Sequence, residues 1–287
     1  EISRSDWSSD VCSSDLPEQF AKLQKELPGE VYITRTLATY SYELNNKKAP
    51  FDNVNIRKAL NLSLDRNVIT DKVLGQGQTP TYVFTPTYIE EGQLIQQPAY
   101  SKEPMAQRNE EAIKLLEEAG YSKANPLKFS ILYNTNENHK KVAIAAASMW
   151  KANTKGLIDV KLENQEWKTY IDSRRAGRYD AARAGWNADY NQATTFGNYF
   201  LSNSSNNTAK YANPEYDKAI AESYVATDAE GRAKAYAKAE EILAKDFGIV
   251  PIFNYVNPRL VKPYVKGYSG KDPQDHIYLR NLYIIKH

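Results

Sequence analysis

The chain has 287 residues, of which 41% are hydrophobic and 25% charged, and its formal net charge is +2 at pH 7. These values are typical of a globular protein with one large or two ordinary domains. No run of about 18 apolar residues occurs, so we expect no membrane-spanning segment. The basic residues form no stripe, which argues against a nucleic-acid partner.

The first sixteen residues differ from the rest of the chain. The run EISRSDWSSDVCSSDL is rich in Ser and Asp, has no hydrophobic periodicity and resembles translated adapter DNA. We therefore interpret residues 1–16 as a non-native, adapter-like segment and exclude them from the fold prediction. Without them the chain has a net charge of +5 and no cysteine, because Cys12 lies in this segment. No signal peptide is recognisable, but if this segment replaces the native start, its absence says nothing about export.

The next part of the chain begins with a helix and a strand. Phe20, Leu23 and Leu27 lie on one face of an amphipathic helix that ends near residue 28. The run 31–45 is rich in Tyr and β-branched residues and predicts one long or two short strands.

Two helices and a loop follow. The run 53–77 predicts two helices, with Asp65 as the N-cap of the second and Gly75 at its end. Four prolines place a long loop at 78–104. The run 106–121 then has the apolar spacing of another helix.

An alternating series forms the centre of the chain. It predicts, in order, strand 128–134, helix 139–153, strand 156–164, helix 165–177 and strand 179–187. This βαβαβ order predicts an α/β fold with a mixed, mainly parallel sheet and covering helices.

The last third of the chain predicts both helices and extended segments. Two helices are expected over 214–248, and two extended segments over 249–257 and 259–268. A final strand is expected within 277–287.

Polar and aromatic residues gather at the end of the third strand of this series, in ARAGWNADYN (182–191). Ligands of open α/β sheets bind at the carboxyl ends of strands, and Gly185 would allow close approach. Asp189 is expected either to hold a cation or to serve as an N-cap or surface residue. Arg183 is expected either to form a fork with a carboxylate or to make an internal salt bridge, for which Asp189 is one partner.

Motifs of catalysis are absent. The sequence has no G-x-G-x-x-G, Walker A, G-x-S-x-G or H-E-x-x-H pattern. His139, His276 and His287 have no metal-ligand spacing, so no metal or other cofactor is expected. A peptide hydrolase that uses His139 and an unassigned serine stays as the alternative from another class. From the residues alone, Arg174 has a surface role by default, and Trp167 and Trp186 are more often core residues.

Long stretches of the chain resemble one protein family. They are VKLENQEWKTYIDSRRAGRYDAARAGWNADYNQATTF (160–196), ALNLSLDRNVITDKV (59–73), LYNTNENHKK (132–141), YVNPRLVKPYVKGYSGKDP (255–273) and the terminal YIIKH. The chain resembles the periplasmic oligopeptide-binding proteins of ABC peptide importers (OppA type) over essentially all of 17–287. The murein-peptide-binding paralogue remains an alternative.

The resemblance implies a fold and a division of the chain. The fold would be periplasmic-binding-protein-like (type II, cluster C), with an α/β second lobe over 39–255. The segments 17–38 and 256–287 would belong to an incomplete first lobe, because family members have roughly five hundred residues. We therefore expect the chain to bind peptide weakly or not at all by itself, and to expose apolar surface that normally packs on the missing half.

The resemblance also assigns roles to residues at this site. Asp189 would accept the α-ammonium group of a bound peptide, and main-chain groups of Gly185 and Asn187 would pair with its backbone by strand addition. The other implied contacts are cations for the peptide carboxylate (Arg183, Arg174 and His139), pocket walls (Trp167 and Trp186) and further lining residues (Asn134, Glu43 and Tyr255).

The implied function is that of a periplasmic receptor without enzymatic activity. Short peptides and the membrane subunits of an ABC peptide permease would be its partners, and we expect a monomer. The chain departs from the family at one covalent feature. A family disulfide usually joins a cysteine near Ala38 to one at Asn187, and both cysteines are absent here.

Overall fold

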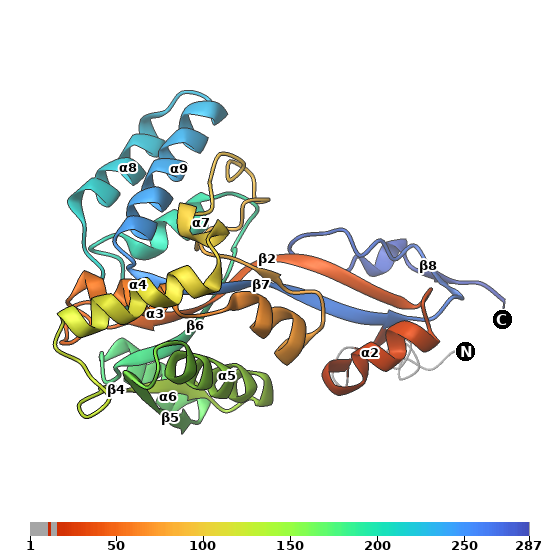
Figure 1. Ribbon diagram of the computed structural model, residues 1–287. Coiled ribbons are helices and arrows are strands. Elements are labelled where there is room, and N and C mark those ends of the chain that lie inside the picture. The colour runs from red at the N-terminus through yellow and green to blue at the C-terminus, as the bar shows by residue number, and fades with distance from the viewer. Residues whose placement is uncertain (1–10, 13–15, 287) are drawn as a thin grey trace.

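The computed structural model describes residues 11–12 and 16–286, which form a body and an elongated arm (Figure 1). Two long antiparallel strands, β2 (Val31–Leu44) and β7 (Ile249–Val261), run through both parts. The Tyr-rich run therefore forms one long strand rather than two short ones. Likewise, the two extended segments expected after residue 248 are mostly one strand.

The body is built on a single mixed sheet. Its strand order is β1-β7-β2-β6-β4-β5, with β3 beside β7. The remaining strands of this sheet are β1 (Val11–Cys12), β3 (Thr79–Pro80), β4 (Leu127–Asn134), β5 (Ile158–Gln165) and β6 (Ala181–Asn187). Strand β4 pairs in parallel with β5 and β6, whereas β2 and β7 make antiparallel pairs. The mixed α/β fold is thus confirmed, and its parallel part is the βαβαβ series.

The two helices of this series cover opposite faces of the sheet. Trp150 of helix α5 (Glu137–Asn153) belongs to the same hydrophobic cluster as Ile131 of β4. Tyr170 of helix α6 (Trp167–Arg175) belongs to a different cluster, together with Leu132 of β4. Ile131 and Leu132 are neighbours in β4, so their side chains point to opposite faces. Because the three strands are parallel, their carboxyl ends meet at one edge of the sheet.

Further helices close the two faces. Asp65 accepts hydrogen bonds from the backbone N–H groups of Asn67 and Val68, and Gly75 ends the helix with φ +64°, as predicted. The segment between them, η1 (Val68–Leu74), is a π-helix. The other helices of the body are α3 (Val54–Leu62), η2 (Ala99–Lys102), α4 (Met105–Glu118), α7 (Thr194–Gly197), η3 (Asn198–Phe200), α8 (Pro214–Val225) and α9 (Ala229–Lys245).

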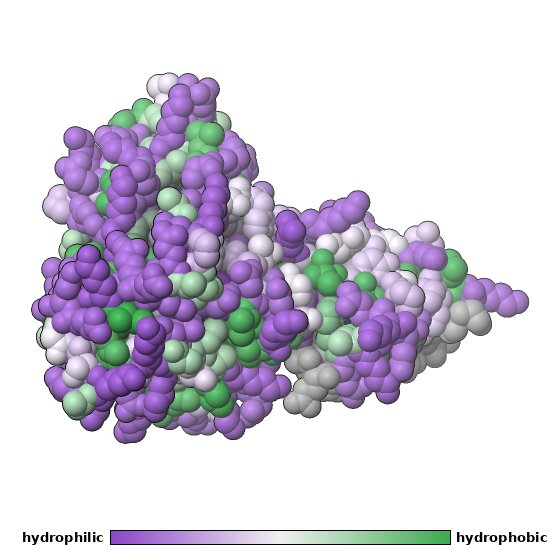
Figure 2. Space-filling model, in the orientation of Figure 1, coloured by the Kyte–Doolittle hydropathy of each residue, from purple (hydrophilic) through white to green (hydrophobic). Residues whose placement is uncertain are grey.

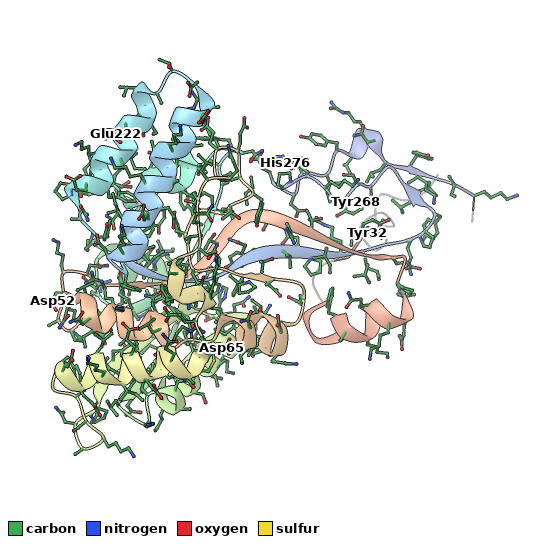
Figure 3. All side chains as sticks on the ribbon, turned by 45° about the horizontal axis from the view of Figure 1, so that its top comes forward. Tyr32, Asp52, Asp65, Glu222, Tyr268 and His276 are labelled. Carbon is green, nitrogen blue, oxygen red and sulfur yellow. The ribbon has the colours of Figure 1, made fainter. Side chains whose placement is uncertain are left out.

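The arm contains the two ends of the described chain. Its short elements are α2 (Leu16–Glu26), β8 (Val265–Lys266), η4 (Leu279–Asn281) and β9 (Tyr283–Ile284). The rings of Tyr32 and Tyr268 meet edge to face at 5.0 Å and join β2 to the loop that follows β8 (Figure 3). The β2–β7 register shifts between Arg35 and Thr39, where the arm meets the body.

The surface is mostly polar, and it is concave where the arm leaves the body (Figure 2). Apolar side chains are scattered over the body in small patches. On the arm, Leu279 is 73% exposed and Tyr283 59% exposed. Within the described part of the chain, no helix is both long and apolar enough to span a bilayer.

Candidate functional site

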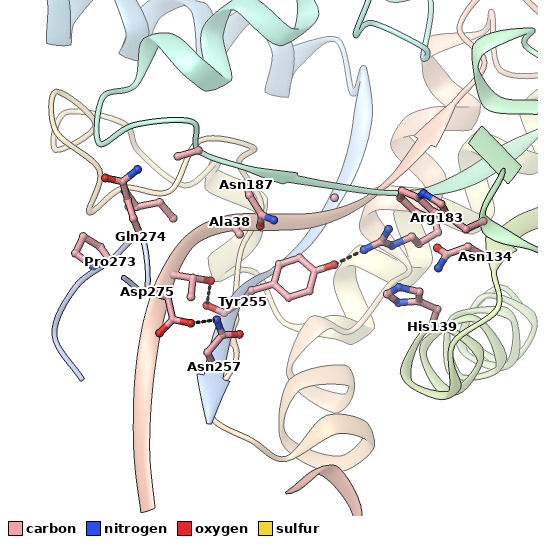
Figure 4. A pocket seen from close by; sticks show the side chains of 15 residues that line it. Ala38, Asn134, His139, Arg183, Asn187, Tyr255, Asn257, Pro273, Gln274 and Asp275 are labelled. Atoms are coloured by element: carbon pink, nitrogen blue, oxygen red, sulfur yellow. Dashed lines mark hydrogen bonds between the residues drawn. The ribbon is translucent and has the colours of Figure 1, made fainter. Parts of the chain in front are cut away.

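A groove of about 600 Å³ lies at the junction of the arm and the body (Figure 4). It is lined by residues of β2, β4, β6, β7, the first turns of α5 and α6, and the loop after β8. Asn134, His139 and Arg183 lie at one end, and Pro273, Gln274 and Asp275 at the other. The groove therefore begins where the parallel strands end, as the general rule for α/β sheets predicts.

Seven of the residues that the sequence singles out line this groove. They are Asn134, His139, Trp167, Arg183, Gly185, Asn187 and Tyr255. They come from five different elements, so the fold has brought together segments that are more than a hundred residues apart in sequence.

Arg183 lies in the groove without an acidic partner. Its Nη2 donates a 2.6 Å hydrogen bond to the hydroxyl of Tyr255, and its guanidinium carbon lies 5.2 Å from the ring centre of Tyr40. Its Nε is buried and has no hydrogen-bond partner. Among the described residues Arg183 makes no ion pair, so the internal salt bridge with Asp189 is not formed. A cation in this setting attracts an anion, since a nearby carboxylate would satisfy both its charge and its free donor.

Two further polar groups beside Arg183 lack partners. Oδ1 of Asn134 and Nδ1 of His139 are both buried without a hydrogen bond. Burial lowers the pKa of His139 most, and repulsion from the Arg183 cation lowers it further, to about 3. His139 is therefore neutral near pH 7, so Arg183 provides the positive charge at this end of the groove.

Strand β6 offers part of its backbone to the groove. It pairs with β2 along its whole length, from Ala181 to Asn187. It pairs with β4 only at Ala181 and Ala182. From Arg183 to Asn187, the edge of β6 that faces away from β2 has no strand partner among the described residues. An extended chain could add to this edge as a further strand.

Gly185 lies where two side chains leave little room for a Cβ atom. A Cβ atom there would lie 2.9 Å from Nη2 of Arg183 and 3.1 Å from the hydroxyl of Tyr255. The missing side chain therefore makes room for the Arg183–Tyr255 hydrogen bond and for the approach of a ligand.

Asp189 follows β6 and is exposed. It does not line the groove itself, but its neighbour Ala188 does. The backbone carbonyl of Asp189 accepts a 3.3 Å hydrogen bond from Nε2 of Gln274, another lining residue. Its carboxylate Oδ2 accepts from the hydroxyl of Thr195 at 3.3 Å. The carboxylate thus stands at the rim of the groove, beyond the end of β6.

The three other predicted residues lie on the opposite face of the sheet. Arg174 and Glu43 form a buried ion pair at 2.9 Å. Arg174 also donates to the hydroxyl of Tyr199, whose ring meets the indole of Trp186 edge to face at 4.9 Å. The side chains of Arg174, Glu43 and Trp186 are therefore absent from the lining of the groove.

A larger cavity, of about 960 Å³, lies between α3, α9 and the loop around Tyr100. The lysines at its rim are already paired, as in Lys58–Glu111 at 2.6 Å and Lys245–Glu241 at 2.7 Å. Among the described residues, it offers no unpaired cation comparable to Arg183, although Oε2 of Glu103 in its lining is buried without a hydrogen-bond partner. The groove at the arm is therefore the better candidate for binding a carboxylate. In the described part of the chain, no three His, Cys, Asp or Glu residues converge as a metal site would require.

Several lining residues are not predicted from the sequence. They are Thr36, Leu37, Ala38, Ala188, Asn257, Pro273, Gln274 and Asp275. Most come from the two long strands and the arm, which meet the end of β6 only through long-range pairing. Their composition is ordinary, and the only available signal was that Ala38 and Asn187 occupy positions of a family disulfide.

Comparison with known proteins places this geometry in a family. The family model of the bacterial extracellular solute-binding proteins, family 5 Middle, matches residues 7–208. The chain is 97% identical over 271 residues to the periplasmic oligopeptide-binding protein OppA of Haemophilus influenzae, covering 94% of this chain and 50% of that protein. It is 43% identical to the periplasmic murein peptide-binding protein MppA of Escherichia coli, covering 97% of this chain and 51% of that protein.

Solved structures give the same result. The crystal structure of Haemophilus influenzae OppA in complex with RPPGFSPFR superimposes with a TM-score of 0.90 at 94% identity. The match covers 96% of this chain and 54% of that one. The chain spans about half the length of the curated relatives that it matches. On the family match and these identities, the chain belongs to the bacterial extracellular solute-binding proteins of family 5.

Proposed function

We propose that the chain is part of a receptor that captures short peptides. The observation that carries this proposal is the free edge of β6, which lies between the unpaired Arg183 cation and the Asp189 carboxylate. Every peptide has a backbone that can add to such an edge, and its two ends carry the opposite charges.

The two charges also define a direction for the peptide. With its ammonium group at Asp189 and its carboxylate toward Arg183, the peptide runs antiparallel to β6. Main-chain groups of Gly185 and Asn187 would pair with it, and Trp167, Asn134 and Tyr255 would contact its side chains or carboxyl end. Main-chain pairing gives affinity without preference for a sequence, and bridging water in a roomy groove tolerates varied side chains.

His139 has a more limited role in this proposal than the sequence suggests. As a neutral group it can hydrogen-bond a carboxylate but adds no charge. The buried pair of Arg174 and Glu43 supports the indole of Trp186, because Tyr199 contacts both the pair and the indole.

The setting of this function is inferred from relatives. Relatives that match the chain are named periplasmic and oligopeptide-binding. We infer a periplasmic, monomeric receptor without enzymatic activity, which delivers peptides to the membrane subunits of an ABC importer. Closure of two lobes by a hinge would exclude water and strengthen the pairing of the ammonium with Asp189.

We also propose the division of the chain into 1–16, 17–38, 39–255 and 256–287. The register shift between Arg35 and Thr39 supports the first-lobe boundary near residue 38. Thr36 in β2 donates to the carbonyl of Tyr255 in the adjacent strand β7. The boundary near residue 38 and the boundary near residue 255 therefore lie next to each other in space. Sequencing of the locus upstream of Pro17 would test whether residues 1–16 are native.

The experiment uses a completed protein, in which the chain is joined to the part of the Haemophilus influenzae relative that it does not match. Titration calorimetry with tri- to pentapeptides is expected to show binding, which the Asp189→Asn substitution weakens by about 2–5 kcal/mol because closure of the lobes would bury the ammonium, which then loses its charged partner. Asp159→Asn is the matched control, since Asp159 pairs with Lys151 at the surface, where its side chain is 51% exposed.

Two further measurements separate the alternatives. Mass spectrometry of the peptide after incubation should recover it intact, and cleavage would contradict the receptor in favour of a hydrolase. Competition between tri-alanine and a murein tripeptide distinguishes an oligopeptide receptor from a murein-peptide receptor. Equal binding by the wild type and Asp189→Asn would mean that the ammonium site lies elsewhere.

A further inference from the structure

Asp189 is held in place by one buried hydroxyl. Its backbone N–H donates to Oγ1 of Thr195 at 3.3 Å, and the same hydroxyl donates to its carboxylate Oδ2 at 3.3 Å. The indole Nε1 of Trp186 also donates to Oγ1 of Thr195, at 3.2 Å. Thr195 is only 5% exposed, whereas Asp189 is exposed.

These three bonds fix the direction of the hydroxyl proton. A threonine hydroxyl has one proton and two acceptor lone pairs. The N–H groups of Trp186 and Asp189 occupy both lone pairs, so the single proton is directed at Oδ2 of Asp189. Thr195 therefore holds one carboxylate oxygen and leaves Oδ1, which accepts no hydrogen bond from the described residues, to meet a cation.

We propose that Thr195 is a positioning residue for the ammonium site, which it couples to the indole of Trp186. The inference rests on the proposed function, because it assigns Thr195 a role only if Asp189 receives a peptide ammonium. Without the hydroxyl, the carboxylate of Asp189 is free to rotate on an exposed turn, and the indole of Trp186 loses its only hydrogen bond to a side chain among the described residues.

The test compares two peptides in the completed protein, tri-alanine and N-acetyl-tri-alanine. Only the first carries an ammonium group, so the ratio of their affinities measures recognition of that group. Thr195→Val keeps the shape of the side chain and removes the hydroxyl. It is expected to lower the affinity for tri-alanine about tenfold, as for loss of a hydrogen bond to a charged group, and to leave the acetylated peptide unchanged. Thr195→Ser keeps the hydroxyl and should restore the wild-type ratio.

The outcomes separate this inference from the proposed function. Equal binding of both peptides by the wild type would contradict the ammonium site, and it would also remove the proposed role of Thr195. A wild type that prefers tri-alanine, together with an unchanged ratio in Thr195→Val, contradicts the role of Thr195 alone. An equal loss for both peptides would mean that Thr195 is merely structural. Thr195→Ala, which is smaller, gives the same readout if the Val variant does not fold.

Discussion

The guanidinium of Arg183 and the hydroxyl of Tyr255 are joined by a 2.6 Å hydrogen bond. Because β2 lies between β6 and β7 in the sheet, this bond crosses the floor of the groove above the ring of Tyr40. It fixes the one unpaired cation that the described residues place in the groove. The position of Arg183 thus depends on a strand more than seventy residues further along the chain.

Tyr255→Phe should weaken peptide binding without unfolding the protein. The ring stays, but Arg183 loses its hydrogen bond and its orientation. Loss of one such bond corresponds to about 0.5–1.5 kcal/mol, to be measured by calorimetry on the completed protein. Tyr224→Phe is the control, because it removes an equally short bond, 2.6 Å to Oδ1 of Asn198, on an exposed surface. Equal effects of the two substitutions would contradict a special role for Tyr255.

Gly185→Ala should separate binding from stability. The new Cβ would lie 2.9 Å from Nη2 of Arg183, the flexible end of a side chain, so the strand can keep its path while the guanidinium moves. We expect a loss of affinity of about tenfold, comparable to removal of a hydrogen bond to a charged group, and a nearly unchanged midpoint of thermal unfolding. Gly29→Ala, with open space around it, is the control for both readouts. A large fall in the midpoint with unchanged affinity would show that Gly185 serves packing only.

The sequence predicted the parallel part of the fold well, because short apolar runs typical of strands alternate there with segments of helical periodicity. The last of these strand runs is followed by polar residues. The sequence predicted Arg183 and Gly185 at the groove for the same reason, since they lie near the end of a strand, whereas Asn187 came from the family resemblance. It could not separate them from Arg174 and Glu43, because which face of the sheet a side chain occupies depends on pairing between distant strands. The π-helical geometry of Val68–Leu74 could not be predicted either, because its apolar pattern is that of an ordinary α-helix.

Glu43→Gln should destabilise the fold. Glu43 is 1% exposed, pairs with Arg174 and accepts a 2.6 Å hydrogen bond from the hydroxyl of Tyr199. Neutralising it leaves the Arg174 cation buried without an opposite charge, which costs about 3–5 kcal/mol, measurable by urea unfolding. Glu241→Gln breaks an exposed pair with Lys245 and should cost at most about 1 kcal/mol. Similar values for the two variants would contradict the importance of burial.

Stability should depend on pH through His139. Its folded-state pKa of about 3 lies below its ordinary value of about 6.5, so between these values the unfolded chain binds a proton that the folded chain does not. Its contribution is therefore complete above pH 6.5 and is lost as the pH falls toward 3. Urea unfolding from pH 7 to pH 4 should show a shallower decline for His139→Gln than for the wild type. His276→Gln, with a side chain 56% exposed, is the control. Identical slopes for the wild type and His139→Gln would contradict the burial of a neutral imidazole.

Ala38 and Asn187 should accept a disulfide. They are directly paired in the antiparallel ladder of β2 and β6, which places their Cα atoms about 4.5–5.5 Å apart, within the range that a disulfide spans. In a Cys12→Ser background, Ala38→Cys with Asn187→Cys is expected to oxidise fully and to stabilise the fold by about 2–4 kcal/mol. Thiol titration and urea unfolding with and without reductant measure both effects. The control pairs Ala38→Cys with Ala184→Cys, because Ala184 lies opposite Ser41, three positions out of register, where no bond can form. Free thiols in the Ala38–Asn187 variant would show that β2 and β6 are not paired in this register. The residues assigned to the unpaired edge of β6 would then be wrong.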